Sequence, residues 1–183
     1  PLTPSATRYR LDCTVDSLSL RTSFDSPFSG AYLQLNSPGV EFNAIGNNGA
    51  CFSSYLNIPD FAELTRVFTP SLIILSMGTN EAFGSDSDEQ IYCSIDSLVR
   101  RGKCRSRKTT AFVTNRRVAE VRNVILRYGR DHKLPVWDLY VIAGGEGASA
   151  KWIADGLMNP RDHVHCLKSG YELRGALLSD ALL

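Results

Sequence analysis

From residue 39 onward, short apolar runs alternate with longer segments in which apolar residues recur every three or four positions. The run at residues 72–75 is apolar on both faces, which is typical of an interior parallel strand covered by helices. Other segments rich in apolar residues predict strands at residues 40–45, 109–114 and 135–142. Strands that alternate with helices predict an α/β fold around a mostly parallel sheet.

Helical periodicity predicts four helices between and after these strands. One begins at Asp60, with Glu63 placed to complete a capping box, and another begins near Asp88. A third covers residues 118–128, where valine, isoleucine and tyrosine recur on one face. The last is a C-terminal helix that starts at the capping-box sequence of residues 169–172.

The first part of the chain has a different pattern. Tyr9, Leu11 and Cys13 alternate with polar residues, which is the period of a half-buried strand. We therefore predict two regions: a short antiparallel β appendage over residues 1–36 and an α/β domain over residues 37–183.

Composition excludes several classes of protein. The 183 residues are 43% hydrophobic and carry a formal net charge of +1, which is typical of a globular domain and does not favour nucleic acid as a partner. The basic run at residues 100–108 is short and contains no aromatic residue. No apolar run is long enough to span a membrane. The five cysteines form no C-x-x-C pair, so a zinc ribbon is not expected.

Three polar segments are candidates for chemistry: residues 47–50 and 78–81, which follow predicted strands, and residues 162–165, which precede the last helix. Taken singly, they are typical of a turn, a helix cap and a surface loop. Together they predict a site. Asp162 can orient His165 as a general base, while the backbone N–H of Gly49 and the side-chain amide of Asn80 can stabilise an oxyanion.

These segments resemble the second, third and fifth blocks of the SGNH (GDSL-like) hydrolases. The matching residues are G-A at 49–50, G-T-N-E at 78–81 and D-x-x-H at 162–165. The resemblance, which is close to secreted members from Bacteroidetes, covers roughly residues 39–183. It implies a flavodoxin-like three-layer α/β/α sandwich and serine ester hydrolysis, with Gly49 and Asn80 in the oxyanion hole, His165 as base and Asp162 as its partner.

The resemblance also implies a small-molecule or glycan ester as substrate, no metal or other cofactor, and a location outside the cell or in the periplasm. His163 does not match the motif and is expected to be a neighbour of the site. The chain begins at Pro1 without a basic and apolar leader, so we expect it to derive from a longer protein.

The nucleophilic serine of the family is not identified in this chain, because no G-D-S sequence occurs. Ser17 follows the nearest similar string, V-D-S, but the alternating pattern around it predicts a strand where the family has a helix. Residues 84–87 are interpreted as a polar loop. A missing segment, either before the chain or near residues 100–110, would explain the lost serine and the weak strand together.

Two other functions are alternatives. The first is an inactive SGNH scaffold that binds glycans through aromatic residues such as Tyr55, Trp137 and Trp152. The second is a phosphate-binding loop at residues 144–147, whose spacing matches neither nucleotide motif and after which we expect no immediate helix.

Overall fold

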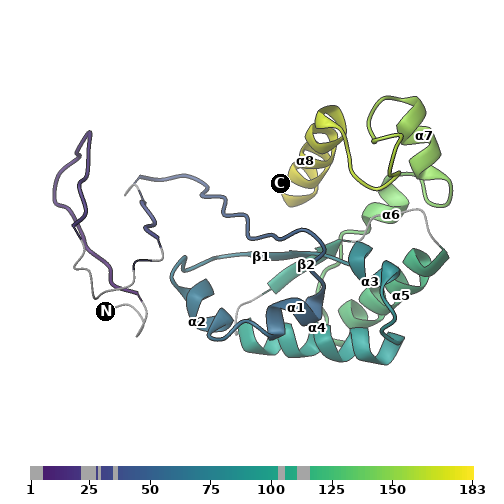
Figure 1. Ribbon diagram of the computed structural model, residues 1–183, viewed down its shortest axis with the longest axis horizontal. Coiled ribbons are helices and arrows are strands. Elements are labelled where there is room, and N and C mark those ends of the chain that lie inside the picture. The colour runs from purple at the N-terminus through teal and green to yellow at the C-terminus, as the bar shows by residue number, and fades with distance from the viewer. Residues whose placement is uncertain (1–5, 22–27, 29, 35–36, 103–105, 111–115) are drawn as a thin grey trace. The chain divides into compact units, whose positions relative to one another are not determined.

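The computed structural model describes residues 6–21, 28, 30–34, 37–102, 106–110 and 116–183 (Figure 1). The chain divides into two compact units, Pro1–Gly46 and Asn47–Leu183. The candidate residues of all three polar segments lie in the second unit. The predicted domain boundary after residue 36 stays a prediction.

Two strand predictions in the first unit are not met by its described residues. Residues 7–21 and 37–46 contain neither helix nor strand, so the strands predicted from the alternation around Leu11 and at 40–45 are absent there. An appendage over residues 1–36 as a whole stays a prediction. Val40 is 99% exposed and Phe42 81%. An alternating sequence supplies only the side-chain period of a strand, whereas a strand also needs a neighbouring chain for its backbone hydrogen bonds.

A parallel sheet lies at the centre of the second unit. Strands β1 (Ile73–Ser76) and β2 (Ser106–Thr110) are parallel neighbours. Ile73 pairs with Ser106 and Ser76 with Thr110, and the register shifts by one residue between Ile73 and Leu75. The predicted strand at 72–75 is thereby confirmed. The strand predicted at 109–114 begins earlier, and its residues 111–114 lie outside the described part of the chain. The described residues give a sheet of two strands.

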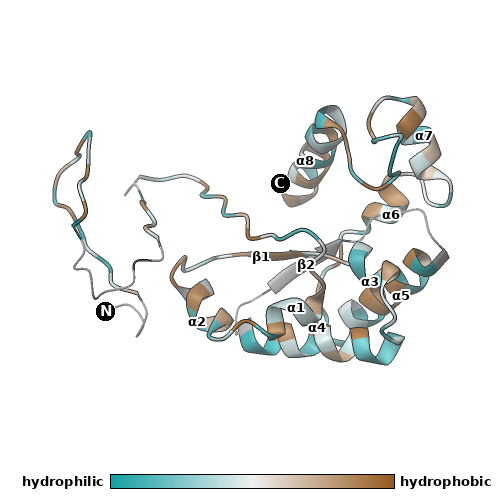
Figure 2. Cartoon of the chain, in the orientation of Figure 1, coloured by the Kyte–Doolittle hydropathy of each residue, from teal (hydrophilic) through white to brown (hydrophobic). Residues whose placement is uncertain are grey.

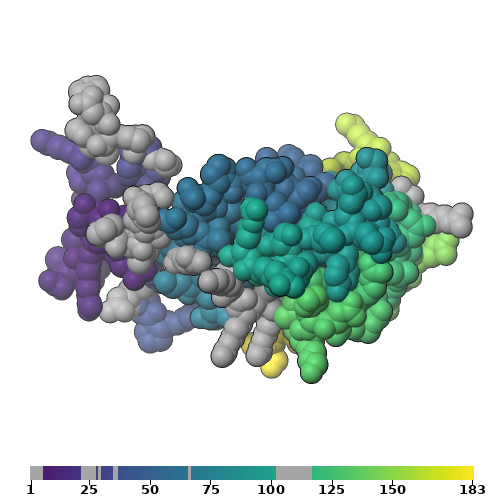
Figure 3. Space-filling model, turned by 90° about the horizontal axis from the view of Figure 1, so that it is seen from below, coloured from purple at the N-terminus to yellow at the C-terminus, as the bar shows by residue number. Residues whose placement is uncertain are grey.

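Amphipathic helices pack together beside this sheet. Helices α4 (Asp88–Gly102) and α5 (Arg116–Asp131) confirm the predictions at Asp88 and at 118–128, and α1 (Phe52–Leu56) and α2 (Phe61–Arg66) also pack on α4. Both long helices carry apolar and polar residues along their length (Figure 2), and Figure 3 shows the side of the molecule that they form. Their buried side chains belong to the first core cluster, which comprises Phe52, Ala82, Ile91, Ile95, Leu98, Val118, Val121, Val124, Ile125 and Tyr128.

A second core cluster joins the C-terminal elements. These are α6 (Leu139–Ile142), α7 (Ala148–Ala154) and α8 (Lys168–Leu182). Trp137, Leu139, Trp152 and Met158 are its largest buried members. No helix in the described ranges has the length and apolar character needed to cross a bilayer.

The strand predicted at residues 135–142 is wrong, because α6 occupies its second half. Asp138 is the N-cap of α6, and its carboxylate accepts a hydrogen bond from the backbone N–H of Val141 at 3.4 Å. The same carboxylate receives the guanidinium of Arg122, with Nε 2.8 and 2.9 Å from its two oxygens. A fixed Asp at a helix N-terminus favours the helical turn over the strand that the apolar run alone predicts.

Two predicted caps form differently. Asp60 precedes α2 as expected, but it adopts a left-handed backbone with φ of 57° and makes no side-chain cap. Helix α8 begins at Lys168, and the hydroxyl of Ser169 donates to the carbonyl of Gly156 at 2.8 Å. The structure also contains short helices that the periodicity did not predict, α1, α6 and α7 among them. They have four, five or seven residues, too few to establish a helical period.

Candidate active site

Asp162 and His165 lie in a loop closed at its base by backbone hydrogen bonds. Met158 and Cys166 form an antiparallel bridge, and the N–H of Asn159 donates to the carbonyl of His165 at 2.8 Å. The N–H of Leu167 donates to the carbonyl of Leu157 at 2.9 Å. The ends of the loop are therefore fixed to each other immediately before α8 begins.

Close packing of α8 holds this loop in place. Gly170 is buried in the first turn of the helix, and a Cβ added there would lie 2.0 Å from the carbonyl oxygen of Leu157. Because that obstacle is backbone, only glycine permits this approach. In the sequence, Gly170 is only one residue of the predicted capping box. Its close approach to the carbonyl of Leu157 could not be predicted, because the two residues are far apart in the sequence.

The carboxylate of Asp162 shapes the loop and orients the imidazole. Its Oδ1 accepts the backbone N–H groups of Val164 and His165, each at 2.9 Å. Its Oδ2 lies 3.2 Å from Nδ1 of His165 and accepts the side-chain amide of Asn159 at 2.8 Å. The backbone N–H groups of His165 and Val164 lower the pKa of Asp162, so the carboxylate is ionised at neutral pH.

The geometry of His165 suits a base that acts on an outside molecule. An ionised Asp162 favours the tautomer with the proton on Nδ1, which leaves Nε2 unprotonated. The side chain is 67% exposed, so a substrate can reach it. His163 is placed differently: its φ is 57°, and its Nε2 lies 3.1 Å from the carbonyl oxygen of Pro160. It is a neighbour in the loop, as the sequence predicted.

A direct hydrogen bond joins Asn80 to the segment that contains Gly49. The side-chain amide of Asn80 donates to the carbonyl of Ala50 at 2.8 Å, and Ala50 follows Gly49. Gly49 has φ of 76° in a turn where the N–H of Ala50 donates to the carbonyl of Asn47 at 3.2 Å. A primary amide has two N–H groups, so the bond to Ala50 uses only one of them.

The segments that carry the oxyanion donors and the loop that carries the base all border the first core cluster. Phe52, two residues after Ala50, is fully buried in the first cluster, and so is Ala82 of α3 (Thr79–Phe83), two residues after Asn80. Val164, from the loop of Asp162 and His165, packs against this cluster. The core therefore connects segments that are far apart in the sequence.

The fold is similar to those of several solved structures. A peptidoglycan O-acetylesterase superposes with a TM-score of 0.67 at 23% identity, over 74% of this chain and 43% of that chain. A lipase/acylhydrolase from Enterococcus faecalis gives 0.58 at 18% identity, over 73% of this chain and 71% of that one. A candidate acylhydrolase from Bacteroides fragilis gives 0.50 at 17% identity, over 73% and 70%.

The chain shares the fold of the SGNH hydrolases. The resemblance of the three sequence blocks is thereby confirmed at the level of the fold. The chain spans less than half the length of the peptidoglycan O-acetylesterase chain, 43%. No protein-family model matches the sequence, and a search of curated proteins found no match.

The serine of an SGNH site is not assigned by this structure. Ser17 is exposed in the first unit, in neither a helix nor a strand. Ser87 caps α4, because its hydroxyl accepts the N–H of Gln90 at 3.2 Å while its own N–H donates to the side chain of Gln90 at 2.7 Å. That capping box supports the interpretation of residues 84–87 as a polar loop leading into a helix.

The aromatic residues proposed for glycan binding are mostly core residues. Trp137 is 9% exposed and Trp152 5%, both in the second cluster, and Tyr55 packs on the first. Trp137 borders a hollow of about 190 Å³ between β1 and α8, which is also lined by Tyr171 and Arg174. A stacking platform for a sugar needs an exposed ring face, which neither tryptophan provides.

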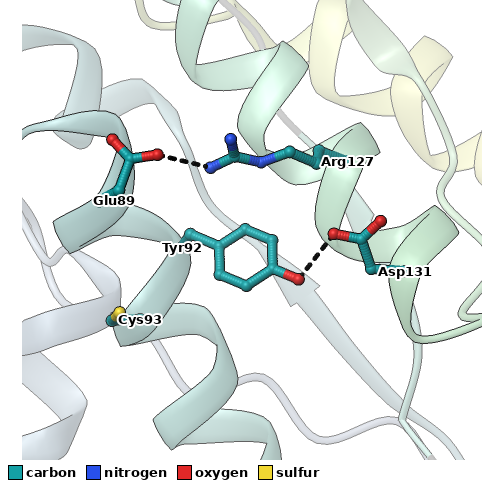
Figure 4. Close-up of a pocket in the computed structure, with 5 residues that line it drawn as sticks. All are labelled: Glu89, Tyr92, Cys93, Arg127 and Asp131. Carbon is teal, nitrogen blue, oxygen red and sulfur yellow. Dashed lines mark hydrogen bonds and ion pairs between the residues drawn. The ribbon is translucent and has the colours of Figure 1, made fainter.

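A surface hollow between α4 and α5 lies outside the predicted site and has a volume of about 300 Å³. Among the residues that line it, Arg127 pairs with Glu89 at 3.3 Å and Tyr92 donates to Asp131 at 2.8 Å (Figure 4). Among the residues described, no group of three metal-ligating side chains could hold an ion. The glycines at 144–147 are followed at once by α7, contrary to expectation.

Proposed function

We propose that this chain is a serine ester hydrolase domain of the SGNH type, with a flavodoxin-like three-layer α/β/α sandwich, that removes a small acyl group such as acetyl. The observation that carries the proposal is the pair of Asp162 Oδ2 and His165 Nδ1 at 3.2 Å, with the imidazole exposed. The hydrogen-bonded segments of Gly49 and Asn80 support it. So does the fold shared with acylhydrolases.

The residues have distinct roles in this mechanism. A serine hydroxyl attacks the ester carbonyl while Nε2 of His165 takes its proton. The N–H of Gly49 and the second amide N–H of Asn80 donate to the oxyanion that forms. His165 then protonates the leaving alcohol, and the C–O bond to that alcohol breaks. In the second half of the reaction, water attacks the acyl-serine while His165 takes its proton, and His165 then returns a proton to the serine oxygen as the acid leaves. Asp162 holds the imidazole and stabilises its cation throughout.

An acetylated glycan is the substrate class that the comparisons favour, since one structural neighbour is named as a peptidoglycan O-acetylesterase. Glycan substrates of this kind lie outside the cytoplasm, so the proposal includes a secreted, periplasmic or surface location.

One observation favours an alternative, in which the chain is an inactive scaffold or a fragment that lacks its nucleophile. The sequence contains no G-D-S, and the described residues place no serine beside His165 with a hydrogen bond. Because both tryptophans are buried, a glycan-binding role would have to rely on other residues.

Labelling with a fluorophosphonate separates the two functions, because the reagent reacts only with a serine activated by a working site. The 183-residue chain is labelled and the modified peptide is mapped, with His165→Ala as the matched control. A label on one serine that disappears in His165→Ala supports the hydrolase and identifies the nucleophile. A wild-type chain that takes no label, although it is folded, supports the alternative.

A further inference from the structure

Glu81 is a buried carboxylate to which the proposed mechanism gives no role. It is 3% exposed, in α3, directly after Asn80. Its Oε1 accepts the backbone N–H of Phe52 at 2.6 Å, and its Oε2 accepts the backbone N–H of Gly78 at 2.9 Å. One side chain therefore holds backbone groups from two segments that are 26 residues apart in the sequence.

The two hydrogen bonds of Glu81 continue a contact that Asn80 begins. Asn80 donates to the carbonyl of Ala50, and Glu81 accepts from the N–H of Phe52, so adjacent residues of one segment bind alternate residues of the other. The bond to Gly78, where φ is 117°, fixes the turn from which Asn80 emerges. Asn80 takes part in these hydrogen bonds directly, and Gly49 directly precedes Ala50, which accepts one of them.

Burying a carboxylate is costly, and burial raises the pKa of Glu81. Two charge-assisted hydrogen bonds offset part of that cost. An apolar residue would fill the same space without the cost, but it would leave the N–H groups of Phe52 and Gly78 without an acceptor. The carboxylate therefore holds the segment of Phe52 next to the segment of Gly78.

We infer that Glu81 is a positioning residue, which sets the placement of Gly49 and Asn80 as oxyanion donors by holding the N–H groups of Phe52 and Gly78. The inference rests on the proposed function. Glu81 itself does not touch the substrate; it acts through the hydrogen bond of Asn80 to Ala50.

The test compares Glu81→Gln with Glu89→Gln in the 183-residue chain. Glutamine has the shape of glutamate but only one acceptor oxygen, so one backbone N–H loses its partner. Glu89 is an exposed residue of α4 outside the proposed site. The first readout is hydrogen exchange of the Asn80 side-chain amide by NMR, and the second is kcat and KM for p-nitrophenyl acetate.

In Glu81→Gln, we expect exchange at the Asn80 amide to increase about tenfold or more and kcat to fall about 10- to 100-fold with KM nearly unchanged, which is below the loss of a whole donor. Glu89→Gln should change neither. Unchanged exchange at Asn80, or unchanged kcat in an active chain, would overturn the inference. A wild-type chain without esterase activity refutes the proposed function instead, and the exchange at Asn80 still decides the role of Glu81.

A second measurement needs no variant. In the wild-type chain, the amide protons of Phe52 and Gly78 and the side-chain amide of Asn80 should shift together with pH, at one midpoint set by Glu81. The titratable neighbours are Asp86 and the Cys51 thiol, and the pKa of that thiol is itself raised. An Asn80 signal that does not follow the other two would contradict the coupling.

Discussion

Nδ1 of His165 lies 3.2 Å from Oδ2 of Asp162, while Oδ1 of the same carboxylate accepts the backbone N–H of His165 at 2.9 Å. One aspartate thus holds both the ring and the backbone of the residue that it orients. The loop and the base are formed by the same contacts, so the orientation of the imidazole is fixed before a substrate binds.

Asp162→Asn should lower kcat/KM for p-nitrophenyl acetate by about 10³- to 10⁴-fold, because an amide can donate to Nδ1 and then favours the wrong tautomer of His165. The amide oxygen can still accept the backbone N–H groups, so the fold should remain. Asp155→Asn, an exposed aspartate at the end of α7, is the control and should keep wild-type activity. Equal activity in both variants would remove Asp162 from the mechanism.

Asn80→Ala should lower kcat by about 10²- to 10³-fold and leave KM nearly unchanged, because the oxyanion forms only in the transition state. Steady-state kinetics on a small acetyl ester measure both constants. Asn123→Ala, at an exposed position on α5, is the matched control. An increase in KM with constant kcat would instead assign Asn80 to binding of the ground state.

Gly170→Ala should destabilise the chain by about 1–3 kcal/mol, since its Cβ would overlap the carbonyl oxygen of Leu157. The same substitution at Gly175, exposed on the same helix and with no atom within 4 Å of an added Cβ, should stabilise it by about 1 kcal/mol through helix propensity. Urea denaturation measures both. If the two variants are equally stable, α8 does not pack as closely on the loop as described.

The ionisation of Glu81 should affect stability and activity in opposite directions. Its pKa is raised above the ordinary 4.5, so the stabilisation that protonation gives the fold is fully present below 4.5 and is lost as pH rises through the raised value. The ionised form is the one that can accept both N–H groups.

As pH falls from the raised pKa of Glu81 toward 4.5, the free energy of unfolding of the wild type should therefore rise relative to that of Glu81→Gln. Over the same pH range, the ratio of kcat of the wild type to kcat of Glu81→Gln should fall. Taking ratios removes any effect of pH that the two proteins share. Stability and kcat that decline together with falling pH would indicate a structural role alone. Denaturant titrations and kinetics at matched pH values supply the two curves.

The sequence predicted those parts of the fold that local periodicity encodes. The run at 72–75, with apolar residues on both faces, became β1, and the periodic segments became α4 and α5. Residues 135–142 were mispredicted because the pattern does not show that Arg122, from another helix, fixes Asp138 as a helix cap. The segment at 40–45 has a strand's alternation but no neighbouring strand in the described residues, and pairing is not a local property.

The candidate site was predicted from motifs because Asp162 and His165 are only three residues apart, so a single loop can join them. Glu81 is part of the G-T-N-E motif, yet its role depends on the N–H of Phe52, which is too far away in the sequence for a local pattern to reveal the contact. The signal in the sequence was a charged residue shortly after an apolar strand, in a segment that is otherwise neutral. The nucleophile stays unassigned for a different reason: the sequence around Ser17 lacks the local pattern that would identify it.

The central claim is that His165 is the general base of an ester hydrolase, and the most direct measurement is p-nitrophenyl acetate hydrolysis by the wild-type chain and by His165→Ala at neutral pH, with His163→Ala as the neighbouring control. We predict that kcat/KM falls at least about 10³-fold in His165→Ala and stays within about twofold in His163→Ala. Equal rates for the wild type and His165→Ala, both folded, would contradict the account.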